Sequence, residues 1–359
     1  MTMPLFKNDT MTVEERGLAN MTHKPVDRVP FSLFALGFSG RAVGYSIFEM
    51  YDDMEKAWDA VGKANLVYGA TGLPWAGFPA IGPWELGGEM QWPHSEFAQT
   101  PNAEPAVTTI EEAWKLKMPT PEEMRHLGYV PRFIQFAHIA KSHGSMFGIP
   151  MYGCWTTAGN IVGISNLSKW TLKDPKLVHH LVNFAKDFLL MFHKIIVDEV
   201  GAELYFAVNS TASAANNIIS PKGFKEFVLP YTIEYHKGMM DMGIPGIMFH
   251  LCGEQNLNYE FYPEVPLPPI SQISVSHEVD LDKASRAFPD YALIGNIEPA
   301  LFQTGTPEQV YEACRVAIEK GKKHKAGFTL APGCEMPPGA LPYNVYMMAK
   351  ACNDFGYFD

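Results

Sequence analysis

The 359-residue chain contains no apolar run of about 18 residues, the length that a membrane-spanning helix needs. Its first residues, MTMPLFKNDT, lack the basic stretch followed by an apolar stretch that marks a secretory signal. The chain has only five cysteines, an odd and sparse set that is typical of reduced thiols in the cytoplasm. We therefore expect a cytoplasmic protein that has no membrane partner.

Positive charge is also scarce, because 28 Lys and Arg residues stand against 39 Asp and Glu residues and the net charge is −11. Such a chain repels the phosphates of nucleic acids and anionic membranes, so we expect neither as a partner. Charged residues make up only 19% of the chain, whereas 47% are hydrophobic, which excludes a disordered protein. The 13% of aromatic residues indicate a lined pocket or a large buried interface.

Short apolar segments alternate with helical patterns along the chain, and eight of these segments are predicted strands. Eight strands separated by helices predict a (β/α)8 barrel, a TIM barrel of the α/β class, as a single domain over residues 1–359. The alternative is an open doubly wound sheet, but the sequence GFSG at 37–40 is not the glycine fingerprint expected after its first strand. The predicted strands cover residues 30–34, 66–70, 146–152, 203–208, 246–250, 270–275, 292–295 and 327–331.

Two segments interrupt this alternation. Residues 1–25 form an N-terminal extension in which Thr12 and Glu15 make a capping box, the signal for the start of a helix. Residues 71–106 are rich in Gly and Pro and form an insertion after the second predicted strand. Within it, residues 84–92 predict a hairpin that turns at two glycines. The insertion lies on the side where barrel active sites form, so it is a candidate rim for docking a partner.

One histidine and two cysteines at predicted strand ends are the strongest candidates for chemistry. His250 and Cys252 are two residues apart, so in a strand both side chains face the same side. Cys334 follows the last predicted strand, and in a closed barrel all strand ends meet at one face. One imidazole and two thiolates with an open position predict a catalytic zinc site. Cys314 and Cys352 lie in helical patterns and are predicted to be buried and inert.

Several motifs around these residues resemble a known family. They are SPKGFKEFVLPY at 220–231, HLCG at 250–253, GNIEP at 295–299, GTPEQV at 305–310 and APGC at 331–334. Together they resemble the uroporphyrinogen decarboxylase superfamily, and the His-x-Cys pair with a late Cys is similar to its zinc-dependent corrinoid methyltransferases. The decarboxylase branch is a poorer match, because its arginine-rich MRQAGR segment is replaced here by FALGFSGR at 34–41.

The resemblance implies an enzyme that moves a methyl group between a small molecule and the cobalt of a corrinoid (cobalamin), which a partner protein carries. It also implies that His250, Cys252 and Cys334 hold Zn²⁺, and His277 or Glu278, which follow strand six, are candidates for the fourth ligand. Two reactions are compatible with such a site. In one, an aromatic methyl ether gives its methyl group to Co(I), which is an O-demethylation. In the other, methylcobalt gives it to a thiol such as coenzyme M.

The residues after the predicted strands favour the methyl ether. Cations that would bind the sulfonate of coenzyme M are scarce there, whereas Trp75, Tyr152 and Trp155 are candidate walls for a flat ring. Asn209 and Asn296 end strands four and seven, where each is a candidate either for a hydrogen bond to the substrate oxygen or for a turn cap. A tetrapyrrole decarboxylase and a non-catalytic zinc-binding barrel are the remaining alternatives.

Overall fold

The computed structural model describes residues 6–77, 79–98 and 100–358, and its centre is a six-stranded parallel sheet. The strands follow one another in sequence order from β3 to β8, and their residues are mostly buried, as is usual for strands covered on both faces. The strands are β3 (Phe147–Tyr152), β4 (Tyr205–Ser210), β5 (Ile247–Leu251), β6 (Gln272–Val275), β7 (Ala292–Ile297) and β8 (Phe328–Pro332).

Two extended segments fill the space between β8 and β3. Phe31 forms a single bridge to Leu330 on β8, and Trp75 forms one to Gly148 on β3. The amide of Thr71 donates to the carbonyl of Phe31 at 2.8 Å, which connects the two segments to each other. The fold is therefore α/β and TIM-barrel-like, with six strands in a ladder and two segments held by isolated contacts.

Six of the eight predicted strands are confirmed, and the first two require correction. Residues 30–34 form a single bridge at Phe31 and no regular ladder, and the run ends at Phe34 with a φ of 44°. The strand predicted at 66–70 is wrong, because most of this run belongs to the end of helix α4 (Met54–Tyr68). Leu66 and Val67 are exposed on the helix surface, so their apolar character does not report burial in a sheet.

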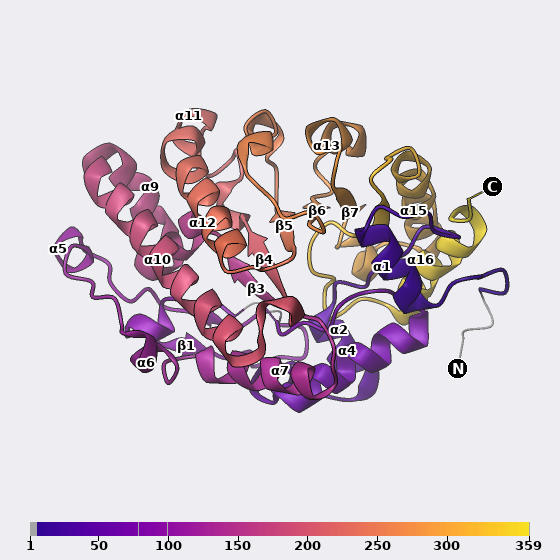
Figure 1. The fold of residues 1–359 in the computed structure, drawn as a ribbon, viewed down its shortest axis with the longest axis horizontal. Coiled ribbons are helices and arrows are strands. Elements are labelled where there is room, and N and C mark those ends of the chain that lie inside the picture. The colour runs from indigo at the N-terminus through magenta and orange to yellow at the C-terminus, as the bar shows by residue number, and fades with distance from the viewer. Residues whose placement is uncertain (1–5, 78, 99, 359) are drawn as a thin grey trace.

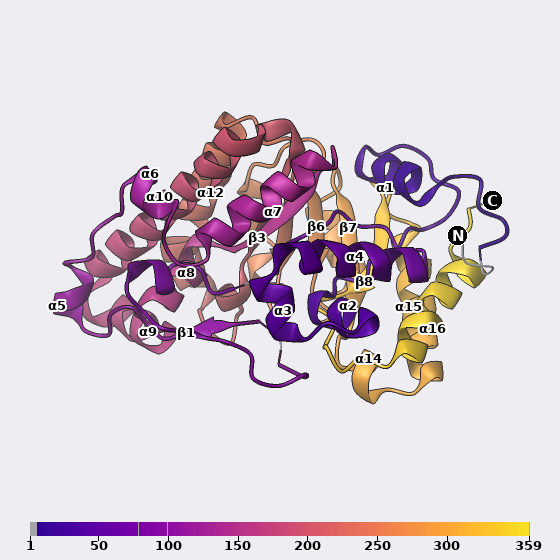
Figure 2. The same ribbon diagram turned by 90° about the horizontal axis from the view of Figure 1, so that it is seen from below.

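Helices surround the strands (Figure 1), and in the view of Figure 2 α4 and α7 cross in front of them. None of the described helices is both long and apolar enough to cross a membrane. The α-helices, besides α4, are α1 (Val13–Met21), α2 (Leu36–Val43), α3 (Ile47–Asp52), α5 (Ile110–Ala113), α6 (Pro121–Met124), α7 (Val130–Ser142), α8 (Cys154–Val162), α9 (Ile164–Lys173), α10 (Pro175–Val200), α11 (Pro221–Gly223), α12 (Leu229–Asp241), α13 (Leu281–Ala287), α14 (Leu301–Thr304), α15 (Pro307–Gly321) and α16 (Pro342–Phe355).

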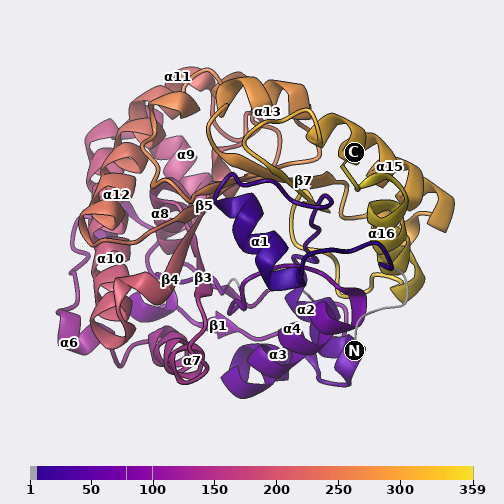
Figure 3. The same cartoon turned by 45° about the vertical axis from the view of Figure 1, so that its right-hand side comes forward.

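Helix α1 lies across one end of the barrel (Figure 3). As predicted, it begins at a capping box, in which the side chains of Thr12 and Glu15 each accept a hydrogen bond from the backbone amide of the other residue. The ring of His23, just after the helix, contacts the carbonyls of Pro269 and Ala326 at 3.3 and 2.8 Å. These two residues precede β6 and β8, so α1 covers the N-terminal ends of the strands.

Two buried arginines fasten the N-terminal segment. Arg16 on α1 pairs with Asp27 at 2.6 Å, and Arg28 pairs with Asp9 at 2.8 Å. The hydroxyl of Tyr357 also donates to Asp9 at 2.8 Å. The segment around α1 is thus tied both to the first extended segment and to the last residues of the chain.

The hairpin predicted for residues 84–92 is wrong. Trp84–Leu86 forms a short 3-10 helix, and Gly87 ends it with a φ of 101°. The strand pair that does form joins β1 (Met90–Gln91) to β2 (Asn102–Ala103) in antiparallel fashion. The glycines therefore terminate a helix, while the strand pair closes a longer loop.

Candidate metal centre

The predicted metal-binding residues meet at the C-terminal end of the strands, opposite α1. His250 lies in β5, Cys252 follows this strand, and Cys334 comes two residues after β8. One ligand atom from each of the three residues lies within 4.8 Å of the other two. The structure therefore brings together one imidazole and two thiols that are remote in the sequence.

The ring of His250 is held on two sides. Its Nδ1 forms a hydrogen bond with Oγ of Ser274, the residue opposite it on β6, at 2.8 Å. The ring of Phe34 packs edge-on against it, with 5.4 Å between the ring centroids. Because Nδ1 has this partner, Nε2 is the nitrogen that is left for a metal.

Glycines beside both cysteines allow the backbone to bend around the cluster. Gly253 has a φ of 78°, in the left-handed region that favours glycine. A Cβ atom at Gly333 would lie only 2.5 Å from the backbone nitrogen of His277. A larger residue at either position would displace the adjacent thiol.

The two thiols are close enough to interact directly, because their Sγ atoms are 3.6 Å apart. The hydrogen bond between them lowers the pKa of Cys252, and the same bond, together with burial, raises the pKa of Cys334 to about 12. The pair therefore holds one proton readily, since two thiolates at this distance repel each other. A cation bound between them would remove this penalty.

A zinc ion fits this set of donors. Two sulfurs that bind a tetrahedral zinc ion at about 2.3 Å would lie about 3.8 Å apart, close to the observed Sγ–Sγ distance of 3.6 Å. Nε2 of His250 would supply a third donor, and a fourth position would stay open. Three protein ligands with one open position are the arrangement of catalytic zinc sites.

Two carboxylates lie near the cluster. They do not belong to it, because the metal-binding group found among the described residues consists of His250, Cys252 and Cys334. Glu278 is exposed in the loop after β6, and its negative charge opposes the ionisation of Cys252. Glu335 is buried, and its carboxylate accepts the amide of Leu36 at 3.3 Å, at the start of α2. Burial raises the pKa of Glu335 to about 8, with a further contribution from the charge of Cys334.

Asn209 points away from the cluster. Side chains alternate along β4, so Phe206 and Val208 face the barrel interior and Asn209 faces α12. Its Nδ2 donates to Nε2 of His236 at 2.7 Å. Burial lowers the pKa of His236 to about 4, which keeps this ring neutral and able to accept the bond. This position does not fit the predicted contact between Asn209 and a substrate.

Asn296 lies on β7 and acts as a support for the loop after β6. Its Nδ2 donates to the carbonyls of Ser276 and Val279 at 3.2 and 2.7 Å. These two residues flank Glu278, so the Asn296 amide fixes the loop that carries this carboxylate. These contacts hold the loop after β6 rather than the turn after β7, and the predicted hydrogen bond from Asn296 to a substrate stays a prediction.

Two of the three predicted aromatic walls lie near the cluster. Trp75 packs against Phe34 with 5.4 Å between ring centroids and lines a cavity inside the barrel. Burial raises the pKa of Tyr152, and the negative charges of Glu335 and Cys334 add to this effect. Tyr152 is the last residue of β3, so it lies at the same C-terminal end of the strands as the thiols.

Trp155 does not fit a role as a wall of the pocket. Its ring is only 2% exposed, and its Nε1 donates to the carbonyl of Ser213 at 3.0 Å. It belongs instead to the packing around α8, where its ring lies 6.4 Å from that of Phe227.

Sequence reasoning missed the two residues that hold His250. Ser274 is a polar residue within the apolar strand β6, and this was a usable signal, because a buried hydroxyl needs a partner. Phe34 gave no comparable signal, since a phenylalanine that ends an apolar run is ordinary core.

Comparison with known proteins agrees with this geometry. Residues 12–355 match the family Uroporphyrinogen decarboxylase (URO-D). A methylcobamide:CoM methyltransferase, MtbA of Methanosarcina acetivorans, is 26% identical over 96% of this chain and 99% of its own length. A methylated-thiol–coenzyme M methyltransferase of Methanosarcina mazei is 25% identical over 75% of this chain and 68% of its own.

A solved structure of a methyltransferase from Methanosarcina mazei has the same fold. It superimposes with a TM-score of 0.79, covers 96% of this chain and 99% of its own, and shares 18% sequence identity. The resemblance stated from the sequence motifs is therefore confirmed. The chain belongs to the uroporphyrinogen decarboxylase family, and both of these Methanosarcina relatives are methyltransferases.

Proposed function

We propose that the protein is a zinc-dependent methyltransferase that moves a methyl group between a small organic molecule and a corrinoid carried by a partner protein. The cluster of His250, Cys252 and Cys334 carries this proposal, because its donors suit a catalytic zinc ion. The relative that matches this chain over nearly its whole length is named for methyl transfer from a methylcobamide. A corrinoid exceeds an ordinary small-molecule pocket, so a carrier protein is expected to present it at the mouth of the barrel.

The protein residues have separate tasks in this proposal. Nε2 of His250 and the two thiolates would hold zinc and leave the fourth position open to substrate, and Glu278 in the neighbouring loop stays the candidate ligand for this position when substrate is absent. Bound zinc supplies a Lewis acid for the heteroatom that carries or receives the methyl group. Tyr152 and Trp75 line the approach, while Asn296 positions the loop of Glu278.

The methyl donor that we propose is an aromatic methyl ether, as expected from the sequence. Transfer would break the O–CH₃ bond, form a cobalt–carbon bond and leave a phenolate. The apolar space beside Phe34 and Trp75 supports an uncharged aromatic donor. The scarcity of cations after the strands agrees with this choice, because a sulfonate needs charged partners.

A thiol such as coenzyme M is the second candidate. Both methyltransferase relatives are named for coenzyme M. Arg41 on α2 offers one cation in this region, where its guanidinium lies 4.8 Å from the ring of Phe97 and donates to the carbonyl of Pro338. A single arginine of this kind would be enough to orient a small sulfonated thiol.

Two reactions of the zinc-loaded protein separate these candidates. In one, cob(I)alamin is mixed with guaiacol, and the formation of methylcobalamin is followed by its absorbance. In the other, methylcobalamin is mixed with coenzyme M. We expect methyl transfer from guaiacol. Transfer to coenzyme M alone would assign the thiol reaction, and no transfer in either mixture would contradict the proposed function.

The hydrogen bond between Ser274 and His250 leads to a separate prediction. Replacing Ser274 with alanine frees Nδ1 and removes the contact that fixes the ring, so zinc affinity should fall roughly 10- to 100-fold. Competition with a chromophoric chelator measures this change. Ser271, whose hydroxyl binds a backbone amide at the start of β5, provides the matched control Ser271→Ala, which should keep the zinc affinity of the wild type.

A further inference from the structure

A large cavity extends from the surface around α1 into the interior of the barrel, where side chains usually fill the space. Its volume is about 1570 Å³. The interiors of TIM barrels are normally packed by layers of side chains, and small-molecule pockets measure roughly 300–1,000 Å³. The cavity is therefore large enough for an organic ligand and is not explained by the fold.

The cavity ends directly beneath the candidate metal centre. Met248 and His250 are two residues apart on β5, so both point inward, and Met248 lines the cavity. Ser274, which holds the ring of His250, lines it as well. Phe34 also belongs to the lining, and its ring touches that of His250. The metal centre thus shares two of its supporting residues with the cavity wall.

The inner part of the cavity is lined mainly by apolar side chains, and the polar side chains that the strands add to it are the uncharged Gln272, Ser274 and Thr329. Val208, Met248 and Ile294 line it from three inward-facing strands, and Trp75 closes one side. All five charged residues of the lining lie within the first 28 residues of the chain, around α1, and they are Lys7, Asp9, Glu14, Glu15 and Arg28. No charged residue among the described lining lies on a strand, so a ligand at the inner end has to be uncharged.

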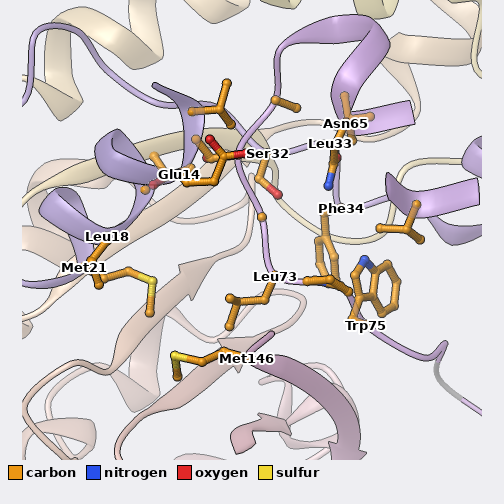
Figure 4. Close-up of a pocket in the computed structure, with 18 of the residues that line it drawn as sticks. Glu14, Leu18, Met21, Ser32, Leu33, Phe34, Asn65, Leu73, Trp75 and Met146 are labelled. Atoms are coloured by element: carbon orange, nitrogen blue, oxygen red, sulfur yellow. The ribbon is translucent and has the colours of Figure 1, made fainter. Parts of the chain in front are cut away.

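The route into the cavity begins on the side of α1. Figure 4 shows the rings of Phe34 and Trp75 on one side of the space and Leu18 and Met21 of α1 on the other. Leu73 and Met146 lie between these groups. The two extended segments at this side form only single bridges, so the wall is less continuous here than between the regular strands.

We propose that this cavity binds the uncharged aromatic body of the methyl donor, which enters from the N-terminal side of the barrel. The corrinoid would then approach the metal centre from the opposite, C-terminal mouth. The inference rests on the proposed function, because it assigns the organic substrate of the same site. Separate entrances would let two bulky reactants reach one metal centre without competing for the same opening.

Filling the cavity provides the test. In Met248→Trp, an indole occupies the space below His250, so the affinity of the zinc-loaded protein for guaiacol, measured by calorimetry, should fall about tenfold or more. The matched control is Met240→Trp, which makes the same change at an exposed position on α12 and should bind guaiacol like the wild type. Both variants should retain the zinc content of the wild type. Equal affinity of Met248→Trp and wild type would overturn the inference.

A crystal grown with 4-bromoanisole tests the location even if Met248→Trp does not fold. We expect the anomalous signal of bromine among Val208, Met248 and Ile294. Bromine at the C-terminal mouth only, or no bromine at all, would overturn the inference. Methyl transfer is measured in parallel with guaiacol and with coenzyme M. Transfer in either mixture without bromine in the cavity rejects this inference alone, whereas no bromine and no transfer in both mixtures rejects the proposed function too.

Discussion

Replacing Cys252 with alanine should abolish stoichiometric zinc binding and methyl transfer together. The change removes one of the three donors that the described part of the chain brings together in the cluster. The apparent free energy of zinc binding at such sites is about 10–16 kcal/mol and is shared by a few ligands. The loss of one thiolate should therefore cost on the order of 3 kcal/mol, which corresponds to more than 100-fold in zinc affinity. Metal analysis after dialysis against a chelator measures zinc, and methylcobalamin formation from cob(I)alamin measures transfer.

The control for this experiment is another cysteine. Cys314 is fully buried in α15, and burial raises the pKa of its thiol well above the usual range, so it is inert. Cys314→Ala should retain zinc and activity despite a small loss of stability. If Cys252→Ala binds zinc as tightly as Cys314→Ala, the assignment of the metal centre is incorrect. If Cys252→Ala loses zinc but keeps its methyltransferase activity, the metal takes no part in the reaction.

The prediction of the fold succeeded where the strands are regular and failed where they are not. Residues 146–152 and 292–295 are short apolar runs in the sequence and ladder strands in the structure. At 66–70 the same kind of run belongs largely to the exposed end of α4. Local sequence cannot distinguish these cases, because an apolar run of five residues fits a strand and the last turn of a helix equally well.

The prediction of the site depended on residue spacing within strands. His250 and Cys252 are two positions apart, and in a strand this spacing points both side chains to the same side. The same period, applied to β4, would have shown that Asn209 faces outward when Phe206 and Val208 face inward. Trp155 could not be judged in this way, because it lies in helix α8 and its direction depends on tertiary packing.

Asp27→Asn is expected to destabilise the protein by about 2 kcal/mol, because the buried guanidinium of Arg16 loses a charged hydrogen-bond partner and keeps only Asp9, at 2.8 Å, as a carboxylate partner. Asp27 also accepts the backbone amides of Thr10 and Met11 at 2.8 and 3.0 Å. Burial opposes ionisation of Asp27, but the bonds from Arg16 and these amides outweigh it and hold its pKa well below the usual range. Urea denaturation measures the free energy of unfolding.

The pH dependence identifies the origin of this stability. The folded state lowers the pKa of Asp27, so its contribution is complete above the unfolded-state value of about 3.9 and decreases as the pH falls further. The difference between wild type and Asp27→Asn should therefore shrink below about pH 4. Asp198→Asn makes the same change in an exposed pair with Lys194 on α10 and should cost at most about 0.5 kcal/mol. An equal loss in both variants would show that α1 is held over the barrel by apolar contacts rather than by the buried charges.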